Sequence, residues 1–318
     1  MKRKRILYGI NGTGVGHISR AKSLIPYLKQ YVDVDILISG KLQELNFDDD
    51  VLYDFTGFTF VYEGGAVNWL KTIFQSHPLQ FIRDMFSMNL KPYDMVVTDF
   101  EPITAWSSVR YKIPSIHISH QASFIDNNVP RPNFKNLIGE YVMKYFCPTT
   151  DYIGLHYKKY GVNISEPIIL PNIQSATVTT KNHITVYLPW YQDDYLYKFF
   201  NSFSDLQFHI FSQHTNILNE LDNCIFHPIN NVNFITSLSS SYGVICNAGF
   251  QTTSEVLYLG KRLMTIPVSG QYEQFCNVAA LNNIGIQSLD NLTSHSHALI
   301  NSWLDVDPVK LDFENNIE

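Results

Sequence analysis

The sequence predicts an α/β protein made of two doubly wound domains, each with a parallel sheet. Its 318 residues suggest two domains at about 150 residues each. Short β-like runs alternate with helical patterns in both halves, and a proline-bounded segment separates the two series. The 45% hydrophobic content excludes a disordered chain, and the formal net charge of −6 argues against a nucleic-acid partner.

The first half contains a strand–helix–strand pattern. The runs Lys4–Ile10 and Val34–Ser39 have the composition of strands. Between them, residues 17–30 carry apolar side chains at the spacing of an amphipathic helix. Met95–Thr98 and Ser115–Ile118 extend the pattern as buried parallel strands.

A second series of strands begins after residue 180. We expect strands at His183–Leu188, Gln207–Phe211, Gly243–Cys246 and Arg262–Ile266, with a helix near Ser254–Leu259. The segment Pro167–Asn172 is expected to be an extended connector, because a proline lies near each end. The predicted boundary lies near residue 175, giving domains 1–175 and 176–318, with a C-terminal tail that packs back on the first domain.

Targeting and membrane signals are weak. The basic start Met1–Arg5 is followed by an apolar run too short for a secretory signal, so we expect a cytoplasmic protein. The four cysteines have no regular spacing, which predicts reduced thiols. The aromatic segment 69–86 is either a membrane-surface helix or part of the interior.

The first chemical motif is the turn Gly12-Thr13-Gly14-Val15-Gly16-His17, placed between a strand and a helix. Glycines at such a turn allow close backbone approach at a helix N-terminus, where anions bind. The G-x-G-x-G spacing differs from the dinucleotide fingerprint, so a nicotinamide enzyme is a weak alternative. A P-loop is excluded because no Gly-Lys-Ser/Thr follows.

His17 is a candidate general base at the start of this helix. Asp99 ends the Met95–Thr98 strand, and strand ends of a doubly wound sheet open onto one crevice. A His17–Asp99 dyad is therefore expected, although Glu101 is an equal candidate for the carboxylate. The alternative interpretation is a histidine that only packs or caps.

The second motif is Cys246-Asn247-Ala248-Gly249-Phe250-Gln251-Thr252-Thr253-Ser254-Glu255, again between a strand and a helix. Gly249 allows the turn, and Gln251, Thr252 and Thr253 place polar groups where a diphosphate binds without a metal. Glu255 is expected to accept hydrogen bonds from ribose hydroxyls, unless the stretch is an ordinary capping box with Glu255 in solvent. Glu273 and Gln274 suit a ligand rich in hydroxyls.

These motifs together resemble the GT-B glycosyltransferases, in particular the superfamily of UDP-sugar-dependent transferases and the peptidoglycan UDP-GlcNAc transferase. The resemblance implies two Rossmann-like domains facing each other across a cleft. It assigns the diphosphate to Gln251, Thr252 and Thr253, the ribose to Glu255, and the donor sugar to Glu273 and Gln274. It assigns acceptor binding to the loop with Gly14, Gly16 and Glu101, and catalysis to His17 with Asp99.

The implied activity is inverting transfer of a sugar from a nucleotide-diphosphate donor, expected to be a UDP-sugar, to a hydroxyl of a glycan or lipid-linked acceptor in cell-surface glycan synthesis. A non-hydrolysing sugar-nucleotide epimerase and a non-catalytic sugar-nucleotide-binding protein remain as alternatives. No cofactor or metal is expected, because Asp33-Val34-Asp35 and Asp305-Val306-Asp307 match the metal-binding Asp-x-Asp pattern only in letters.

Overall fold

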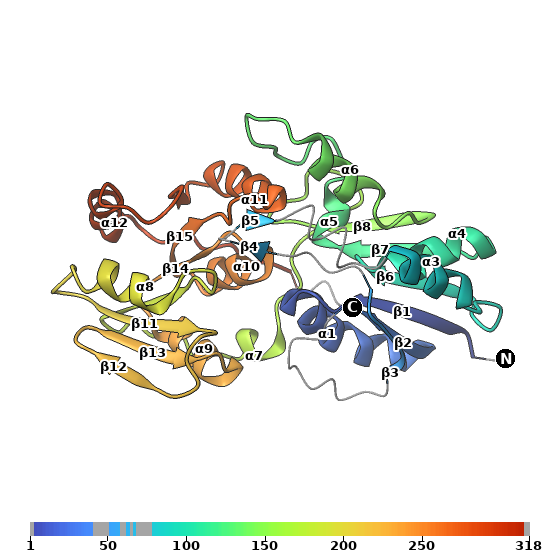
Figure 1. Cartoon of the computed structure of the whole chain (residues 1–318), viewed down its shortest axis with the longest axis horizontal. Coiled ribbons are helices and arrows are strands. Elements are labelled where there is room, and N and C mark those ends of the chain that lie inside the picture. The colour runs from blue at the N-terminus through green and yellow to red at the C-terminus, as the bar shows by residue number, and fades with distance from the viewer. Residues whose placement is uncertain (1–2, 41–50, 58–61, 64–65, 68–77, 315–318) are drawn as a thin grey trace. The chain divides into compact units, whose positions relative to one another are not determined.

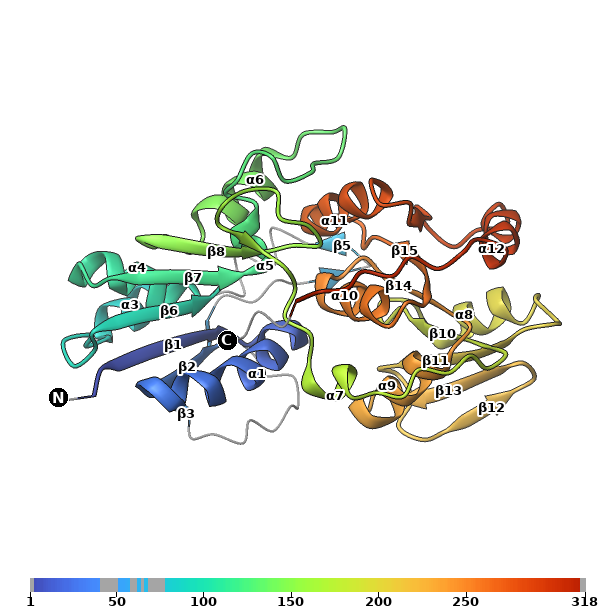
Figure 2. The same cartoon turned by 180° about the vertical axis from the view of Figure 1, so that it is seen from behind.

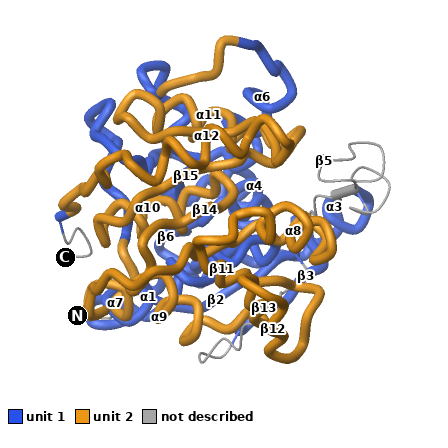
Figure 3. Tube along the Cα trace, turned by 90° about the vertical axis from the view of Figure 1, so that its left-hand side faces the viewer, with its two compact units in different colours: residues 1–129, 134–168, 314–318 blue, residues 130–133, 169–313 orange. Residues whose placement is uncertain are grey.

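The computed structural model describes residues 3–40, 51–57, 62–63, 66–67 and 78–314. The chain forms two compact units, coloured separately in Figure 3. Unit 1 comprises residues 1–129, 134–168 and 314–318, and unit 2 comprises residues 130–133 and 169–313. The units therefore separate between Ile168 and Ile169, just ahead of the boundary near residue 175 expected from the sequence.

Unit 1 is built on a seven-stranded sheet in the order β3-β2-β1-β6-β7-β8-β9, and each neighbouring pair is parallel. Figure 1 shows this sheet with its helices. A separate antiparallel pair joins β4 to β5. The elements are β1 (Arg5–Asn11), α1 (Val15–Tyr31), β2 (Asp33–Ser39), β3 (Val51–Phe55), β4 (Tyr62–Glu63), β5 (Ala66–Val67), α3 (Pro78–Ser87), β6 (Met95–Asp99), α4 (Pro102–Tyr111), β7 (Ser115–Ser119), α5 (His120–Ser123), α6 (Leu137–Tyr145), β8 (Asp151–Leu155) and β9 (Ile164–Ser165).

Helices α1 and α4 cover opposite faces of this sheet. In the register of β1 with β6, Gly9 lies opposite Thr98 and Ile10 lies opposite Asp99. A Cβ at Gly9 would overlap Thr104 of α4, whereas Asp99, on the other face, bonds Arg20 of α1. Side chains alternate between faces along a strand, so the unit is doubly wound as the sequence predicts.

Unit 2 is built on a second seven-stranded sheet in the order β12-β13-β11-β10-β14-β15-β16. Only its edge pair, β12 with β13, is antiparallel. Figure 2 shows the chain of Figure 1 from behind, with the elements of this unit labelled. The elements are α7 (Pro171–Gln174), β10 (His183–Tyr187), α8 (Asp193–Phe200), β11 (Gln207–Ser212), β12 (Asn219–Leu221), β13 (Cys224–Pro228), α9 (Asn231–Ser240), β14 (Gly243–Asn247), α10 (Phe250–Tyr258), β15 (Arg262–Ile266), α11 (Tyr272–Asn282), β16 (Gln287–Ser288) and α12 (Ser296–Leu304).

The two faces of the second sheet differ in chemistry. One face carries a hydrophobic core in which Val186 and Ile245 cluster with Phe200 of α8 and Trp303 of α12. On the other face, the Thr185 hydroxyl lies 2.7 Å from the Ser237 hydroxyl of α9. Burial on both faces explains why these strands appear in the sequence as nearly continuous apolar runs.

Two sequence predictions need correction at their boundaries. The helix expected near Ser254–Leu259 begins at Phe250, because Gly249 ends the turn and leaves the following residues free to become helical. The connector Pro167–Asn172 is not extended throughout, because Pro171 starts the short helix α7. In the segment 69–86, residues 78–86 belong to α3, and residues 69–77 lie outside the described part of the chain.

The described residues contain no helix with the length and apolar character needed to cross a lipid bilayer. All four cysteines are free and buried, in agreement with the reduced thiols expected from their spacing.

Candidate functional site

Each sheet reverses its strand order at its first strand, and the predicted site residues lie there. In unit 1 the order changes at β1, between β2 and β6, and in unit 2 it changes at β10, between β11 and β14. Ligands of doubly wound sheets bind outside the carboxyl ends of the strands at such points. Asn11 ends β1 and Asp99 ends β6, while Asn247 ends β14.

The glycine-rich turn after β1 is held by its own backbone and by Asn11. The Asn11 Oδ1 accepts from the Thr13 N–H at 3.0 Å and from the Thr13 hydroxyl at 2.6 Å. Gly12 donates to the Ser39 carbonyl at 2.7 Å, and a Cβ there would come within 3.0 Å of the Gly40 carbonyl. Gly14 is the N-cap of α1, which begins at Val15 without a side-chain cap, and Gly16 lies in its first turn.

The structure brings His17 and Asp99 together. The His17 Nδ1 lies 2.6 Å from the Asp99 Oδ1. An ionised carboxylate accepts hydrogen bonds and donates none, so at this distance Nδ1 carries the proton. Nε2 is then the unprotonated nitrogen, and His17 makes no hydrogen bond through it to any described residue. The His17 side chain is 12% exposed, whereas that of Asp99 is fully buried.

A third residue, Arg20, completes this group and was missed in the sequence analysis. Its Nε donates to Asp99 Oδ2 at 2.7 Å and its Nη2 to Asp99 Oδ1 at 2.6 Å. Arg20 is only 3% exposed, which is rare for an arginine unless it is paired. The available signal was its position three residues after His17, because residues so spaced on a helix lie side by side.

Asp99 is held in its ionised form. Burial would raise the pKa of this carboxyl group, but the positive charge of Arg20, together with His17 and their hydrogen bonds, lowers it below its usual value. We refer to His17, Arg20 and Asp99 below as the imidazole cluster.

Glu101 does not take part in the imidazole cluster, which settles the choice between the two carboxylates left open by the sequence. Its oxygens accept from the N–H groups of Ile103 and Thr104 at 2.8 and 2.7 Å, and from the Ser39 hydroxyl at 2.6 Å. It is the N-cap of α4. Burial raises the pKa of this carboxyl group.

The residue between the two carboxylates, Phe100, has a left-handed backbone with φ of 53°. This conformation is uncommon for a residue with a side chain and is often found at functional sites. It turns the chain sharply, so that Asp99 points to α1 and Glu101 caps α4. The Phe100 ring stacks between the imidazoles of His17 and His117, at centroid distances of 6.2 and 5.9 Å.

In unit 2, the N-terminus of α10 carries the predicted diphosphate residues. Gly249 is the N-cap, no side chain caps the helix, and a Cβ at Gly249 would meet no atom within 4 Å. Thr252 is half-buried. The Thr253 hydroxyl donates to the Gly249 carbonyl at 2.8 Å, so it is used within the helix itself.

Glu255 is buried, which contradicts the alternative of a capping box with this carboxylate in solvent. It is 5% exposed, and it accepts from the Gln251 Nε2 at 2.8 Å. Burial raises the pKa of Glu255 to about 7, against an opposing effect of the Gln251 hydrogen bond. The half-buried Gln251 therefore holds a buried carboxylate one turn into α10.

Glu273 and Gln274 lie in the first turn of α11, after the neighbouring strand β15. Both the oxygen and the nitrogen of the Gln274 side-chain amide make hydrogen bonds. Its Oε1 accepts from the Val268 N–H at 2.9 Å, and its Nε2 donates to Gln271 Oε1 at 2.5 Å. The turns are tied together, since Asn277 donates to the Ala248 carbonyl at 2.9 Å. Glu273 is half-buried at this edge.

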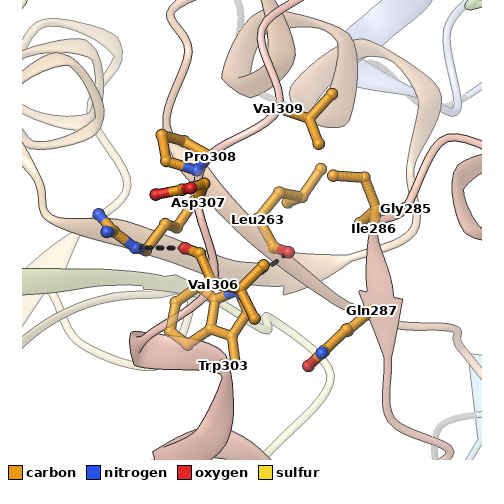
Figure 4. A pocket seen from close by; sticks show the side chains of 10 residues that line it. Leu263, Gly285, Ile286, Gln287, Trp303, Val306, Asp307, Pro308 and Val309 are labelled. Atoms are coloured by element: carbon orange, nitrogen blue, oxygen red, sulfur yellow. Dashed lines mark hydrogen bonds between the residues drawn. The ribbon is translucent and has the colours of Figure 1, made fainter.

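A pocket elsewhere in unit 2 does not involve the predicted site residues. This pocket, shown in Figure 4, lies between β15 and the segment after α12 and is lined by residues such as Arg262, Trp303 and Pro308. None of the predicted site residues lines it. The described residues also contain no cluster of three histidine, cysteine or acidic side chains that could hold a metal.

The carboxylates of the two Asp-x-Asp sequences serve structural contacts or lie in the tail. Asp35 pairs with Arg5 at 2.6 Å and accepts from the Tyr93 hydroxyl at 2.6 Å. Asp305 is the C-cap of α12.

One sequence family matches most of this chain. The sequence model of "Glycosyl transferase family 1" matches residues 4–307. No curated protein matches the sequence.

Among solved structures, Medicago truncatula UGT71G1 complexed with UDP-glucose has a TM-score of 0.62 at 10% identity, covering 97% of this chain and 91% of that one. A kitacinnamycin glycotransferase gives 0.62 at 12% identity, with coverages of 96% and 92%. MurG of Acinetobacter baumannii gives 0.58 at 14% identity, with coverages of 95% and 92%. Likenesses at these identities show the fold, and these neighbours have the GT-B fold. Because the family match spans nearly the whole sequence, this chain belongs to glycosyl transferase family 1 and is a GT-B glycosyltransferase.

Proposed function

We propose that this glycosyltransferase is inverting and needs no metal, and that it moves a sugar from a nucleotide-diphosphate donor to an acceptor hydroxyl. His17 acts as the general base. As the acceptor oxygen attacks the anomeric carbon, its proton passes to His17 Nε2, and the bond from that carbon to the diphosphate breaks. The nucleoside diphosphate leaves with the electron pair of that bond.

The single observation that carries this proposal is the contact of His17 with Asp99. A base needs one nitrogen held and the other free, and the 2.6 Å contact from Nδ1 to the Asp99 carboxylate leaves Nε2 unprotonated. The buried negative charge of Asp99 also stabilises the imidazolium that forms on proton transfer. The position of His17 beside the strand-order reversal supports the same role.

The donor half of the proposal rests on unit 2. The start of α10, which no side chain caps, suits a diphosphate at the positive end of the helix dipole, helped by Gln251 and Thr252. Glu255 is the proposed acceptor for ribose hydroxyls, and Glu273 contacts the sugar. Gln274 has its amide engaged within the protein, so its proposed contribution is one remaining N–H. UDP is the proposed nucleotide, in line with the UDP-glucose bound to the Medicago neighbour.

The proposed acceptor is a glycan or lipid-linked precursor of a cell-surface glycan, handled at the cytoplasmic face of a membrane. Leu79, Ile82 and Phe86 of α3 are exposed, which supports peripheral membrane contact through the described part of segment 69–86. Sedimentation with vesicles containing anionic lipid tests this contact. Replacing Leu79 and Phe86 by serine should release the protein from the vesicles, and unchanged sedimentation would contradict the contact.

The main experiment tests the base. A thermal-shift panel of nucleotide sugars first selects the donor, because a ligand at about 100 times its Kd adds about 2.7 kcal/mol of stability. His17→Ala should then lower turnover at least about 100-fold with little change in donor affinity. The matched control is His295→Ala, an exposed histidine of unit 2, which should keep normal turnover.

Near-normal turnover of His17→Ala would remove His17 from the mechanism. Conversion of the donor into an epimerised nucleotide sugar, with no acceptor present, would show epimerisation in place of transfer.

A further inference from the structure

We propose that Arg20 is a positioning residue of this site: it locks the Asp99 carboxylate against His17 and places a positive charge beside the imidazole before the acceptor proton arrives. The inference rests on the proposed function, because it assigns Arg20 a role through the base. It concerns a residue that neither the sequence motifs nor the proposed donor contacts include.

The guanidinium of Arg20 fixes the orientation of the Asp99 carboxylate. Arg20 donates to both oxygens of Asp99, at 2.7 and 2.6 Å, so the carboxylate cannot rotate without breaking a charged hydrogen bond. Asp99 Oδ1, which accepts from Arg20, is also the oxygen that contacts His17 Nδ1 at 2.6 Å. The plane of the carboxylate, and with it the direction of the imidazole, is therefore fixed by the guanidinium.

Arg20 also changes the balance of charge around His17. A histidine beside a lone buried carboxylate takes up a proton readily, because the ion pair neutralises both groups. Here the Asp99 charge is already balanced by Arg20, and the Arg20 Nη2 lies 3.0 Å from the His17 Nδ1. A proton on His17 Nε2 would give the imidazole cluster a net charge of +1. The positive charge of Arg20 thus acts against a second positive charge on the imidazole.

Four other titratable groups of the described residues near the imidazole cluster are neutral or directed elsewhere. His117 of β7 lies across the Phe100 ring, and burial lowers its pKa to about 3, so it carries no charge at neutral pH. Tyr8 of β1 is fully buried, which raises its pKa and keeps its hydroxyl neutral. The Cys147 thiol has its pKa raised by burial. Glu101 directs its oxygens to α4 and Ser39.

These surroundings also exclude a simpler role for Arg20. Its guanidinium is 3% exposed and bound to Asp99, so it is not placed to meet a donor diphosphate directly. A direct diphosphate contact would predict weaker donor binding when Arg20 is changed. The positioning role predicts an altered titration of His17 with donor affinity preserved.

The experiment uses the full chain labelled with ¹⁵N-histidine, without any ligand. The His17 imidazole is assigned by its loss in His17→Gln, and its titration is followed by NMR. In Arg20→Met, the pH at which His17 is half protonated should rise by about 1 unit or more, since a cation beside it has been removed. Arg20→Lys keeps a positive charge beside the imidazole, so the midpoint should stay within about 0.3 unit of that of the unchanged protein.

Lys22→Met is the matched control, because it removes a cation from the same helix at a position outside the cluster. Its titration should equal that of the unchanged protein. Thermal unfolding of every variant shows that the titrations are measured on folded protein. If Arg20→Met does not fold, Arg20→Ala with guanidinium in solution replaces it, and the His17 midpoint should fall as guanidinium is added while sodium at equal ionic strength has no effect.

A folded Arg20→Met protein with an unchanged His17 midpoint would overturn the proposal, as would a midpoint in Arg20→Ala that ignores guanidinium. The titration needs no substrate, so it is independent of the identity of the base. If His17→Ala remains active while the Arg20 variants shift the His17 titration, the proposed function fails and the electrostatic role of Arg20 stands.

Turnover tests the role of Arg20 in a second way. Arg20→Met should lower kcat about 10- to 100-fold with donor affinity unchanged, and the acid limb of its pH profile should move to higher pH. Unchanged kcat and pH profile in a folded Arg20→Met protein would also overturn the proposal.

Discussion

Two buried carboxylates, Asp99 and Glu101, lie two residues apart and have different partners. Asp99 faces the guanidinium of Arg20, which lowers its pKa in spite of burial. Glu101 pairs with no cation among the described residues: it accepts from two backbone N–H groups and one hydroxyl, and burial raises its pKa. The left-handed turn at Phe100 separates them, so one is available to the site and the other stabilises α4.

This difference gives a stability prediction. Glu101→Ala removes the N-cap of α4 and leaves the Ser39 hydroxyl without its acceptor, so the free energy of unfolding should fall by about 2–4 kcal/mol. Glu101→Gln keeps an acceptor oxygen and should lose less. Urea denaturation measures both, and the titration of His17 should not change. An Ala variant as stable as the unchanged protein would contradict the capping role.

Glu255 gives a prediction about pH. Its pKa rises from 4.5 to about 7 on folding, so between these values the folded state binds more protons than the unfolded state. Stability therefore decreases as pH rises from about 4.5 to 7, by up to about 3 kcal/mol from this group. Glu255→Gln lacks this loss.

The measurement is denaturation of Glu255→Gln and the unchanged protein at pH 4 and pH 8. The two should be similar at pH 4, and the variant should be more stable at pH 8. The variant should also bind the donor more weakly. A stability difference that does not depend on pH would refute the linkage.

At the scale of elements, the starts of the helices divide into two kinds. Helices α4, α5, α6 and α9 begin with side-chain caps from Glu101, Ser119, Asn136 and Asn230. Helices α1, α10 and α11, which carry the predicted site residues, begin without one, as do α7, α8 and α12. The starts of α1, α10 and α11 lie at the positive end of the helix dipole, which attracts an anionic ligand.

Two glycine substitutions separate binding from folding. Gly249→Ala adds a methyl group that meets no atom within 4 Å, so stability should change by less than about 0.5 kcal/mol. The methyl group would lie where a diphosphate approaches α10, so donor affinity should fall about 10-fold. Gly154→Ala would overlap the backbone of Ser123 and should cost about 1–3 kcal/mol.

Thermal unfolding and donor titration measure both variants. Full donor affinity in Gly249→Ala would remove this helix start from the diphosphate site. A Gly154→Ala protein of normal stability would show that β8 and α5 can move apart at little cost.

At the scale of the whole molecule, each unit has its own sheet and its own hydrophobic cluster, as Val96 and Leu7 show in unit 1 and Phe200 and Trp303 in unit 2. The division of labour that we propose gives the donor to unit 2 and the base to unit 1. Binding of a nucleoside diphosphate should therefore protect the backbone amides of unit 2 more than those of unit 1.

Hydrogen exchange with and without UDP tests this division. Amides at the start of α10 and in the turn between β15 and α11 should exchange more slowly with UDP, because bound and buried N–H groups open less often. The imidazole cluster should show a smaller change. Protection confined to Gly12–His17, with none at α10, would assign the diphosphate to unit 1 instead.

Much of this molecule was predictable because local patterns determine it. Period-3.6 spacing and continuous apolar runs located α1, β6, β10 and β15 within about two residues, and the glycine turns marked the strand–helix junctions. The start of α10 was predicted four residues too late, since its polar first turn carries no apolar periodicity.

The residues at the strand ends show the limit of such patterns. The sequence by itself determined that His17 and an acidic residue near position 99 would lie at the carboxyl edge of one parallel sheet, because strand polarity and alternation are local properties. Only the tertiary structure decided that Asp99 contacts His17 while Glu101 caps a helix, that Arg20 completes the cluster, and that Glu255 is buried. The contacts of Asp99 with His17 and Arg20 join residues about 80 positions apart, which no local pattern encodes.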